Sequence, residues 1–266
     1  MKIADIKSVL NQAVAHYPDS LQAAQHSDIE RIAFHIKLVV DEKGTEGSLC
    51  DIGGGIGLFP IGCAALGMKV TLIDDFGDKI NKEFGSGIFD VHDMYRIRVI
   101  AKNVIEDDLD FPKMYFDSIT SFDSMEHWHH SPKGLFHRIL SWLKPGGLFV
   151  LGVPNCVNLR KRVSVPFGVG KWSQMEEWYE SDVFRGHVRE PDVDDLEYIA
   201  MDMNLTKHRI VGRNWLGYNS RVGIVKRLVP YVDHVLRLRP SLCSDIYLVG
   251  KSELSTIGEI EDRSFT

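Results

Sequence analysis

A glycine-rich segment directly after a short apolar strand constrains the fold of this chain more than any other feature. Residues 48–52 (SLCDI) have the composition of a short buried strand, and GGGIG follows at once. Gly53, Gly55 and Gly57 allow the backbone to turn tightly and to approach a ligand closely. Asp74 lies near the end of the next β-rich segment, 21 residues after Gly53, where a carboxylate can accept both hydroxyl groups of a ribose. The pattern therefore predicts a strand–turn–helix site for a nucleoside cofactor.

The rest of the chain alternates between strand and helix patterns. Strands are expected at residues 69–75, 116–123, 146–154, 208–215 and 245–251, and helices at residues 59–67, 131–143, 192–203 and 221–239. Strands that alternate with helices form parallel β-α-β units. We therefore predict an α/β fold with a Rossmann-like, doubly wound sheet, seven-stranded and mostly parallel, whose last strand is antiparallel.

Changes of period divide the chain into parts. The N-terminal residues carry apolar side chains at three-to-four spacing, which predicts helices, with Ser27 and Glu30 as a capping box. The pattern loosens past Pro154, which predicts an insertion after the fifth strand. The expected parts are a helical N-terminal extension or cap (1–47), a cofactor-binding core (48–155), an insertion (156–190), the completion of the core (191–254) and a flexible tail (255–266).

Two details of the glycine-rich segment distinguish between nucleoside cofactors. The dinucleotide pattern GxGxxG requires glycine at its sixth position, where this chain has Leu58. Asp51, shortly before the glycines, would repel a pyrophosphate but suits a cofactor that carries an ammonium group. Both details favour S-adenosylmethionine over NAD, and they argue against a nucleotide-dependent oxidoreductase.

Four motifs together resemble the class I S-adenosylmethionine-dependent methyltransferases. They are CDIGGGIG, VTLIDD, FDSITSFDSMEHW and LKPGGLFVLGVPN, and within residues 45–155 they follow the order and spacing of that family. The chain is similar to methyltransferases of types 11 and 23. The later stretch FRGHVREPDVDDLEYIA looks like a segment of methyltransferases from polysaccharide and glycolipid gene clusters. The resemblance implies a methyltransferase (EC 2.1.1.-) with S-adenosylmethionine as cofactor.

The same resemblance implies which residues bind the cofactor. It assigns the methionine end to Asp51 and the three glycines, and the ribose diol to Asp74. An acidic or polar residue before the fourth strand meets the adenine amino group in the family, and either Glu106 or Asp107 has that place here. The other implied residues are Asp75 or Phe76 beside the adenine, and Phe122 and Asp123 beside the methyl group.

The histidines after the fourth strand bear on the chemistry. Methyl transfer is an in-line displacement at a sulfonium, so the protein mainly supplies positioning and, for a hydroxyl acceptor, a base. The chain has SFDSMEHW where enzymes that methylate amino groups of nucleic-acid bases have an NPPY-like signature, which favours an oxygen acceptor. Histidine is the natural proton acceptor near neutral pH, and His129 and His187 are the first candidates. His127 is a third candidate, for which we expect a structural role instead. The triplet HWHH lacks a paired carboxylate or cysteine at ligand spacing, so we expect no metal.

The insertion carries features that suit recognition of the methyl acceptor. Basic side chains follow the fifth strand on the expected ligand side of the sheet, where they can hold a phosphate or carboxylate. Flat aromatic side chains nearby can stack on a sugar ring or form the wall of an apolar cavity. The alternatives are a solvated basic face and a hydrophobic cluster that fastens the insertion to the core. The candidates are Arg160, Lys161, Arg162, Lys171, Trp172 and Arg189, with Trp178, Tyr179 and Phe184 close by.

Composition and charge exclude several other classes of protein. The 31 basic and 37 acidic residues give a net charge of −6, which disfavours a nucleic-acid partner. No apolar run reaches the ~20 residues of a membrane span, and the first residues lack the apolar run of a signal peptide. Four separated cysteines without a CxxC pair predict reduced thiols and a cytoplasmic protein. The basic amphipathic stretch 221–239 is expected to pack on the sheet, and weak peripheral contact with an anionic membrane is the alternative.

The sequence thus predicts a methyltransferase that modifies an oxygen of a sugar, a glycan precursor or another small polar metabolite. A quinone or phenolic acceptor is an alternative, which requires an apolar cavity and leaves little use for Arg160–Arg162. A non-catalytic protein that only binds S-adenosylmethionine is a second alternative, because fold does not imply function. The oligomeric state stays open.

Overall fold

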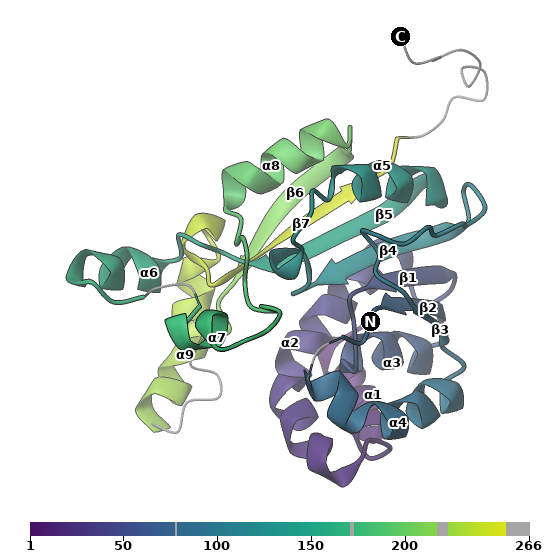
Figure 1. The fold of residues 1–266 in the computed structure, drawn as a ribbon, viewed down its shortest axis with the longest axis horizontal. Coiled ribbons are helices and arrows are strands. Elements are labelled where there is room, and N and C mark those ends of the chain that lie inside the picture. Colours follow the sequence, from purple (N-terminus) through teal and green to yellow (C-terminus); the bar gives the residue numbers. More distant parts are fainter. Residues whose placement is uncertain (78, 171–172, 217–222, 254–266) are drawn as a thin grey trace.

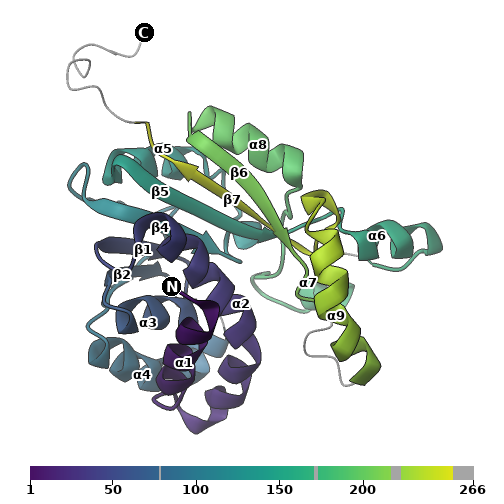
Figure 2. The same cartoon turned by 180° about the vertical axis from the view of Figure 1, so that it is seen from behind.

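A seven-stranded sheet runs through the centre of the molecule (Figures 1 and 2), and this computed structural model describes residues 1–77, 79–170, 173–216 and 223–253. The strand order is β3-β2-β1-β4-β5-β7-β6. Neighbours from β3 to β5 are parallel, whereas β7 is antiparallel to both β5 and β6. The predicted mostly parallel sheet with an antiparallel last strand is confirmed. The strands are β1 (Ser48–Ile52), β2 (Lys69–Asp74), β3 (Arg98–Ala101), β4 (Phe116–Phe122), β5 (Leu143–Pro154), β6 (Thr206–Arg213) and β7 (Asp245–Lys251).

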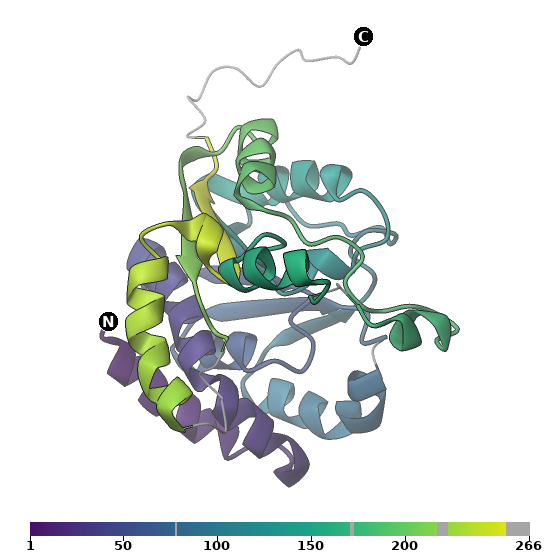
Figure 3. The ribbon, with the colours of Figure 1, turned by 90° about the vertical axis from the view of Figure 1, so that its left-hand side faces the viewer.

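Helices cover both faces of the sheet, as Figure 3 shows. Side chains alternate between the faces along each strand, so Leu148 and Val150 of β5 enter one core and Phe149 and Leu151 enter the other. Because both faces are covered, the strands are apolar on both sides, as parallel sheets require. One face carries α1 (Ile3–Val14), α2 (Asp19–Lys43), α3 (Leu58–Ala65) and α4 (Lys79–Met94), and the other carries α5 (Lys133–Trp142) and α8 (Val193–Asp202).

The N-terminal helices are joined to the sheet through α3. A Cβ built on Gly62 would lie 2.5 Å from Leu10 and 2.6 Å from Ile36, so the glycine permits the close approach of α1 and α2. The capping box expected at Ser27 is wrong, because α2 begins at Asp19 and Ser27 lies inside it. The apolar stripe of α2 starts earlier than expected, at the buried Leu21.

The segment between β5 and α8 extends away from the sheet (Figure 1). It contains α6 (Leu159–Ser164), the 3-10 turn η2 (Val165–Phe167) and α7 (Met175–Tyr179). Residues 183–189, which we call the returning segment, then lead back to the core, where the backbone N–H groups of Val188 and Arg189 donate to the carbonyl oxygen of Glu126 at 2.7 and 3.2 Å. The returning segment therefore lies directly beside η1 (Met125–His127), the turn that follows β4.

The C-terminal helix α9 (Gly223–Leu236) has three buried residues among those whose burial the structure describes. Val229, Asp233 and Leu236 face inward, whereas apolar side chains such as Ile224 and Tyr231 are exposed. The expectation that this stretch packs its apolar face on the sheet is wrong for these exposed side chains and holds for Val229 and Leu236, which are buried. No helix in the described ranges is long and apolar enough to cross a membrane. Peripheral contact with a membrane surface stays a prediction.

Candidate functional site

The turn after β1 has the tight geometry that the sequence predicts. Gly53 (φ 75°) and Gly55 (φ 49°) adopt left-handed backbone conformations, which cost side-chain-bearing residues energy. A Cβ on Gly53 would also lie 1.9 Å from the Ser124 hydroxyl oxygen, so the turn packs directly on the segment after β4. Gly57 is the N-cap residue of α3, and its N–H group donates to the Gly54 carbonyl at 2.8 Å.

A pocket of about 630 Å³ opens beside this turn, at the carboxyl ends of the first four strands. The strand order reverses at β1, which lies between β2 and β4, and open α/β sheets bind ligands at this kind of switch point. The volume suits a ligand of the size of a nucleoside cofactor. The pocket is lined by residues 53, 73–75, 102–106, 123–124, 127–130 and 183–185.

Asp74 and Asp75 form the wall of the pocket at the end of β2. The two carboxylate oxygens of Asp74 accept the N–H groups of Gly55 (2.9 Å) and Phe76 (2.7 Å), which fixes the carboxylate next to the glycine turn. A carboxylate can accept about four hydrogen bonds, which is more than these two N–H groups use. Asp75 pairs with Arg185 of the returning segment, with an N–O distance of 3.1 Å.

Asp51 lies beneath the turn instead of on the pocket wall. It is 1% exposed, and a Cβ on Gly54 would lie 2.1 Å from its carboxylate oxygen. Burial raises the pKa of Asp51 to about 7, and a 2.7 Å hydrogen bond from the Thr120 hydroxyl opposes that rise. The carboxyl group therefore supports the turn from below and changes charge near neutral pH.

The structure separates the two acids that compete for the adenine position. Glu106 lines the pocket, where its carboxylate lies 3.2 Å from His130. The Asp107 carboxylate instead accepts the N–H group of Asn103 at 2.8 Å and closes a local turn. Glu106 is thus the acid that can face a bound ligand.

The two residues at the end of β4 point in different directions. The Phe122 ring stacks on the buried His35 of α2, with ring centres 4.1 Å apart, and it does not reach the pocket. Asp123 has φ 50° and lines the pocket, where it forms an ion pair with Arg31 of α2. Burial raises the pKa of Asp123, and the guanidinium of Arg31 opposes the rise.

Two histidines after β4 hold the returning segment over the mouth of the pocket. His127 Nδ1 lies 2.8 Å from the carbonyl oxygen of Arg185, and His129 Nε2 lies 3.0 Å from that of Phe184. His187, 60 residues along the chain from His127, comes close to it, with ring centres 4.8 Å apart. The structure therefore brings together His127 and His187, which the sequence separates.

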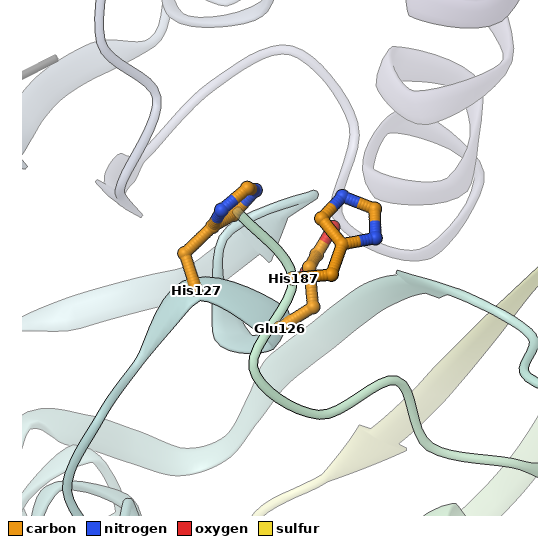
Figure 4. A group of neighbouring side chains, drawn as sticks. All are labelled: Glu126, His127 and His187. Carbon is orange, nitrogen blue, oxygen red and sulfur yellow. The ribbon is translucent and has the colours of Figure 1, made fainter. Parts of the chain in front are cut away.

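Glu126, His127 and His187 form a compact group, which we call the Glu126 cluster (Figure 4). Glu126 is 1% exposed, and its Oε2 atom has no hydrogen-bond partner. Burial raises the pKa of Glu126 well above its usual range, and the carboxylates of Asp123, Glu190 and Asp245 raise it further. A carboxylate in this position needs a cationic or proton-donating partner.

A family model described as a methyltransferase domain matches residues 24–210 of this chain. The chain belongs to this methyltransferase family. No curated protein matches it in sequence.

Solved structures are similar to this methyltransferase over most of its length. A SAM-dependent methyltransferase from Archaeoglobus fulgidus has a TM-score of 0.54 and 16% identity, covering 84% of this chain and 93% of that one. A second similar structure is the Burkholderia thailandensis 1,6-didemethyltoxoflavin-N1-methyltransferase with bound 1,6-didemethyltoxoflavin and S-adenosylhomocysteine. Its TM-score is 0.52 and its sequence identity 16%, and the match covers 95% of this chain and 91% of that one. A methyltransferase in complex with the Haloferax volcanii Trm112 methyltransferase activator has a TM-score of 0.54 and 17% sequence identity, and the match covers 92% of this chain and 97% of that one. At these identities the likeness establishes the fold.

The methyltransferase uses S-adenosylmethionine, the methyl donor of its family. The residues of the pocket fit that cofactor. Asp74 presents a carboxylate at the position expected for the ribose, and Glu106 lies toward the β3 end, where the adenine is expected. The turn at Gly53 leaves backbone exposed to a ligand beside both.

The basic residues expected to bind the acceptor are dispersed. Lys161 is buried in an ion pair with Glu190, and Arg162 donates to the carbonyl oxygens of Val157 (2.6 Å) and Ser241 (3.2 Å). Arg160 is exposed on α6.

The remaining acceptor candidates are also apart from the pocket, with one exception. Arg189 pairs at 2.9 Å with Asp195 in the first turn of α8. Within the described residues, neither it nor the three basic residues of α6 line the pocket, and Trp178 and Tyr179 on α7 do not line it either. Phe184 does line it. Lys171 and Trp172 lie outside the described residues.

Other residues that line the pocket or contact its lining were not found from the sequence. Arg31 reaches the end of β4 from α2, and only a contact between distant segments reveals it. Arg185 stands in the FRGH stretch that drew attention to His187, yet its ion pair with Asp75 has no local signature. Ser124 and Trp128 flank the EH pair, and a 3.2 Å hydrogen bond from Trp128 Nε1 to the Ser124 hydroxyl holds them together.

Proposed function

We propose that this methyltransferase transfers the methyl group of S-adenosylmethionine to an oxygen of a small polar acceptor, such as a sugar or glycan precursor. The observation that carries the proposal is the end of the pocket at β4, where Asp123 and His127 line the wall and the rest of the Glu126 cluster lies directly behind. A hydroxyl group must lose its proton when it accepts a methyl group, so a site for oxygen acceptors requires proton acceptors at this place.

The residues in and around the pocket have separate roles in this reaction. S-adenosylmethionine, when bound, supplies an activated methyl group on a positively charged sulfur. Asp74 orients the ribose, Glu106 faces the adenine, and Asp51 supports the glycine turn from below. His127 holds its Nδ1 on the Arg185 carbonyl, so Nδ1 carries a proton and Nε2 is left to accept one from the acceptor hydroxyl. His187 assists from the returning segment, and His129 holds Phe184 in place over the pocket.

The polar character of this end of the pocket favours a polar acceptor. Asp123, Ser124 and His127 present charged or hydrogen-bonding groups, and Arg31 lies against Asp123. A quinone or other apolar phenol would shield these polar groups from water and offer them few new hydrogen bonds, which costs binding energy. The similar Burkholderia thailandensis structure, a 1,6-didemethyltoxoflavin-N1-methyltransferase, holds bound 1,6-didemethyltoxoflavin, which supports a small-molecule acceptor for this chain too.

Calorimetric titration followed by a transfer assay tests the proposal. The purified protein is titrated with S-adenosylmethionine, S-adenosylhomocysteine and NAD, and it is then incubated with methyl-labelled S-adenosylmethionine and a panel of nucleotide sugars, free sugars, catechols and hydroquinones. We expect binding of the two adenosyl compounds, none of NAD, and label in a sugar. Label only in phenols would replace the acceptor class, and cofactor binding without transfer to any class of acceptor would favour a protein that only binds the cofactor.

A further inference from the structure

The Glu126 cluster has the composition and spacing of a metal site. One carboxylate and two imidazoles each offer a ligand atom, and these atoms lie within 4.8 Å of one another. Ligand atoms on a tetrahedral ion with bonds of about 2.0–2.1 Å are roughly 3.3 Å apart, so small side-chain rotations close the site. Figure 4 shows the three side chains close together, with Glu126 and His127 on one turn and His187 on the neighbouring segment.

The backbone brings the third side chain to the other two. Glu126 and His127 are adjacent in η1, whereas His187 comes from the returning segment. The two hydrogen bonds from Val188 and Arg189 to the Glu126 carbonyl fix that segment beside η1. The position of His187 over Glu126 is therefore built into the fold and does not depend on a single flexible side chain.

The second nitrogen of each imidazole is held as metal-binding histidines require. His127 Nδ1 lies 2.8 Å from the Arg185 carbonyl oxygen, and His187 Nδ1 lies 2.8 Å from a carboxylate oxygen of Glu190. Both partners accept hydrogen bonds only, so Nδ1 carries the proton in each ring and Nε2 presents a lone pair. Histidines that bind metal ions usually donate their other N–H group to a carbonyl or carboxylate in this way.

The charges around the cluster also call for a cation. Glu126 Oε2 is buried without a hydrogen-bond partner. Its electrostatic neighbours include the carboxylates of Asp123, Glu190 and Asp245. Among the described residues, Arg31 pairs with Asp123 and Lys161 pairs with Glu190, which leaves the charge of Glu126 without an ion pair of its own.

We propose that Glu126, His127 and His187 bind one divalent cation at the edge of the methyl-transfer pocket. Two imidazoles and one carboxylate suit borderline first-row ions from Mn²⁺ to Zn²⁺, and three protein ligands leave positions open for a substrate, as in catalytic zinc sites. The proposal departs from the expectation of no metal, which considered only the adjacent residues of HWHH. Sequence spacing could not include His187, which stands 60 residues after His127.

The cation has a role that rests on the proposed O-methyl transfer. The acceptor oxygen occupies an open position on the ion, which lowers the pKa of the hydroxyl group. The hydroxyl proton leaves to water, and the oxygen forms a bond to the methyl carbon. The carbon–sulfur bond breaks, and its electron pair stays on the sulfur of S-adenosylhomocysteine. In this form of the reaction the two histidines bind the ion instead of accepting the proton.

Metal titration tests the site without an acceptor. Tag-free protein is treated with EDTA, dialysed, and titrated with MnCl₂ by electron paramagnetic resonance and with ZnSO₄ by calorimetry. We expect one ion per chain with a Kd below about 100 μM. Glu126→Gln and His187→Gln should each weaken the Kd by ~100-fold or more, because each removes a direct ligand.

A matched control is available in a second histidine that touches a carbonyl and a carboxylate. His208 lies 3.1 Å from the Leu205 carbonyl oxygen and 2.9 Å from Glu197, so both of its ring nitrogens are used. His208→Gln should leave the Kd unchanged. Equal loss in this control, or wild-type affinity in Glu126→Gln and His187→Gln, would overturn the proposal.

Two further measurements keep the result independent of folding and of the proposed function. The absorption of Co²⁺ added to the wild-type protein needs no variant, and a spectrum like that of the ion in water overturns the site. S-adenosylmethionine is titrated into the same samples. Cofactor binding without cation binding would contradict the proposed cation site and leave the proposed function standing. Cation binding without cofactor binding would contradict the proposed function and support the cation site.

Discussion

Two aspartates on either side of the glycine turn differ in their surroundings, and this difference separates their roles. Asp74 lies on the pocket wall, with backbone N–H groups of Gly55 and Phe76 on its two oxygens. Asp51 lies below the turn, almost fully buried. The first can touch a ligand, whereas the second acts through the turn.

Asp74→Asn tests the direct contact. The amide keeps the shape of the side chain but loses the charge that strengthens hydrogen bonds from ribose hydroxyls, and such bonds contribute about 1.5–3 kcal/mol. We expect the Kd for S-adenosylmethionine, measured by calorimetry, to rise by roughly 10- to 100-fold. Asp41→Asn removes the same charge from the outer surface of α2 and should leave the Kd unchanged. Unchanged affinity in Asp74→Asn would remove Asp74 from the cofactor site.

Asp51→Asn tests the buried carboxyl through the pH dependence of stability. The pKa of about 7 in the folded protein exceeds the ordinary value of 3.8, so the folded state binds the proton more tightly than the unfolded state does. The stability from this group is fully present below about pH 4 and is lost as the pH rises through about 7. Asparagine can keep the hydrogen bond from Thr120 and does not titrate. Urea unfolding from pH 4 to 8 should therefore show a shallower decline of the unfolding free energy in the variant, and parallel curves would contradict the buried charge.

The sequence predicts the position of a residue correctly where the motif that contains the residue also determines its surroundings. Asp74 and Asp123 line the pocket at the ends of their strands, and the sequence placed both there. The sequence does not distinguish Glu106 from Asp107. The two residues are adjacent, and only the folded turn shows that Asp107 closes it and Glu106 lines the pocket. The sequence predicted Phe122 at the methyl group, but alternation along β4 turns that ring toward His35 on the other face of the sheet.

Among the elements, the sequence identified the strands and helices that carry strong periodicity. It missed α4 and β3. The four residues of β3 form an edge strand without a fully buried side chain, so its apolar signal is weak. It also treated Arg160, Lys161 and Arg162 as one basic patch. Consecutive residues on a helix point in different directions, and the three side chains accordingly have different surroundings.

The ion pair between Lys161 and Glu190 joins α6 to the returning segment, and it gives a prediction about the insertion. Burial raises the pKa of Glu190, but hydrogen bonds from His187 and Lys161 lower it overall. Lys161→Met would leave a buried carboxylate with one of its partners removed, and breaking such pairs costs about 3–5 kcal/mol. We expect a loss of this size in the unfolding free energy measured with urea.

The double variant and an exposed neighbour complete this test. Lys161→Met with Glu190→Gln removes both charges and should recover most of the lost stability, because the desolvated charge is gone. Arg160→Ala, on the exposed side of α6, should change the unfolding free energy by less than about 0.5 kcal/mol. A Lys161→Met variant as stable as Arg160→Ala would mean that the ion pair contributes nothing to the attachment of the insertion.

At the scale of the whole molecule, the pocket is assembled from segments that are far apart in the chain. The core between β1 and β5 supplies its floor, and the returning segment supplies the residues over its mouth. Arg31 of α2 does not line the pocket but pairs with the lining residue Asp123. Local patterns predict each segment, but the contacts between segments depend on how the helices and the insertion pack. This is why the sequence could place Asp74 and Asp123 at the pocket and could not predict the Glu126 cluster.

Because these segments meet at the pocket, cofactor binding should stabilise the folded molecule as a unit. A ligand at 100 times its Kd adds about 2.7 kcal/mol to the unfolding free energy if it binds only the folded state. For a chain of this size, each kcal/mol raises the Tm by about 2–4 °C, so S-adenosylmethionine or S-adenosylhomocysteine should raise it by about 5–10 °C. NAD should produce no shift, and Asp74→Asn should require a higher concentration of S-adenosylmethionine for the same rise. A shift that saturates with NAD instead would mean that the pocket recognises a dinucleotide, and the assignments at Asp74 and Glu106 would have to be revised.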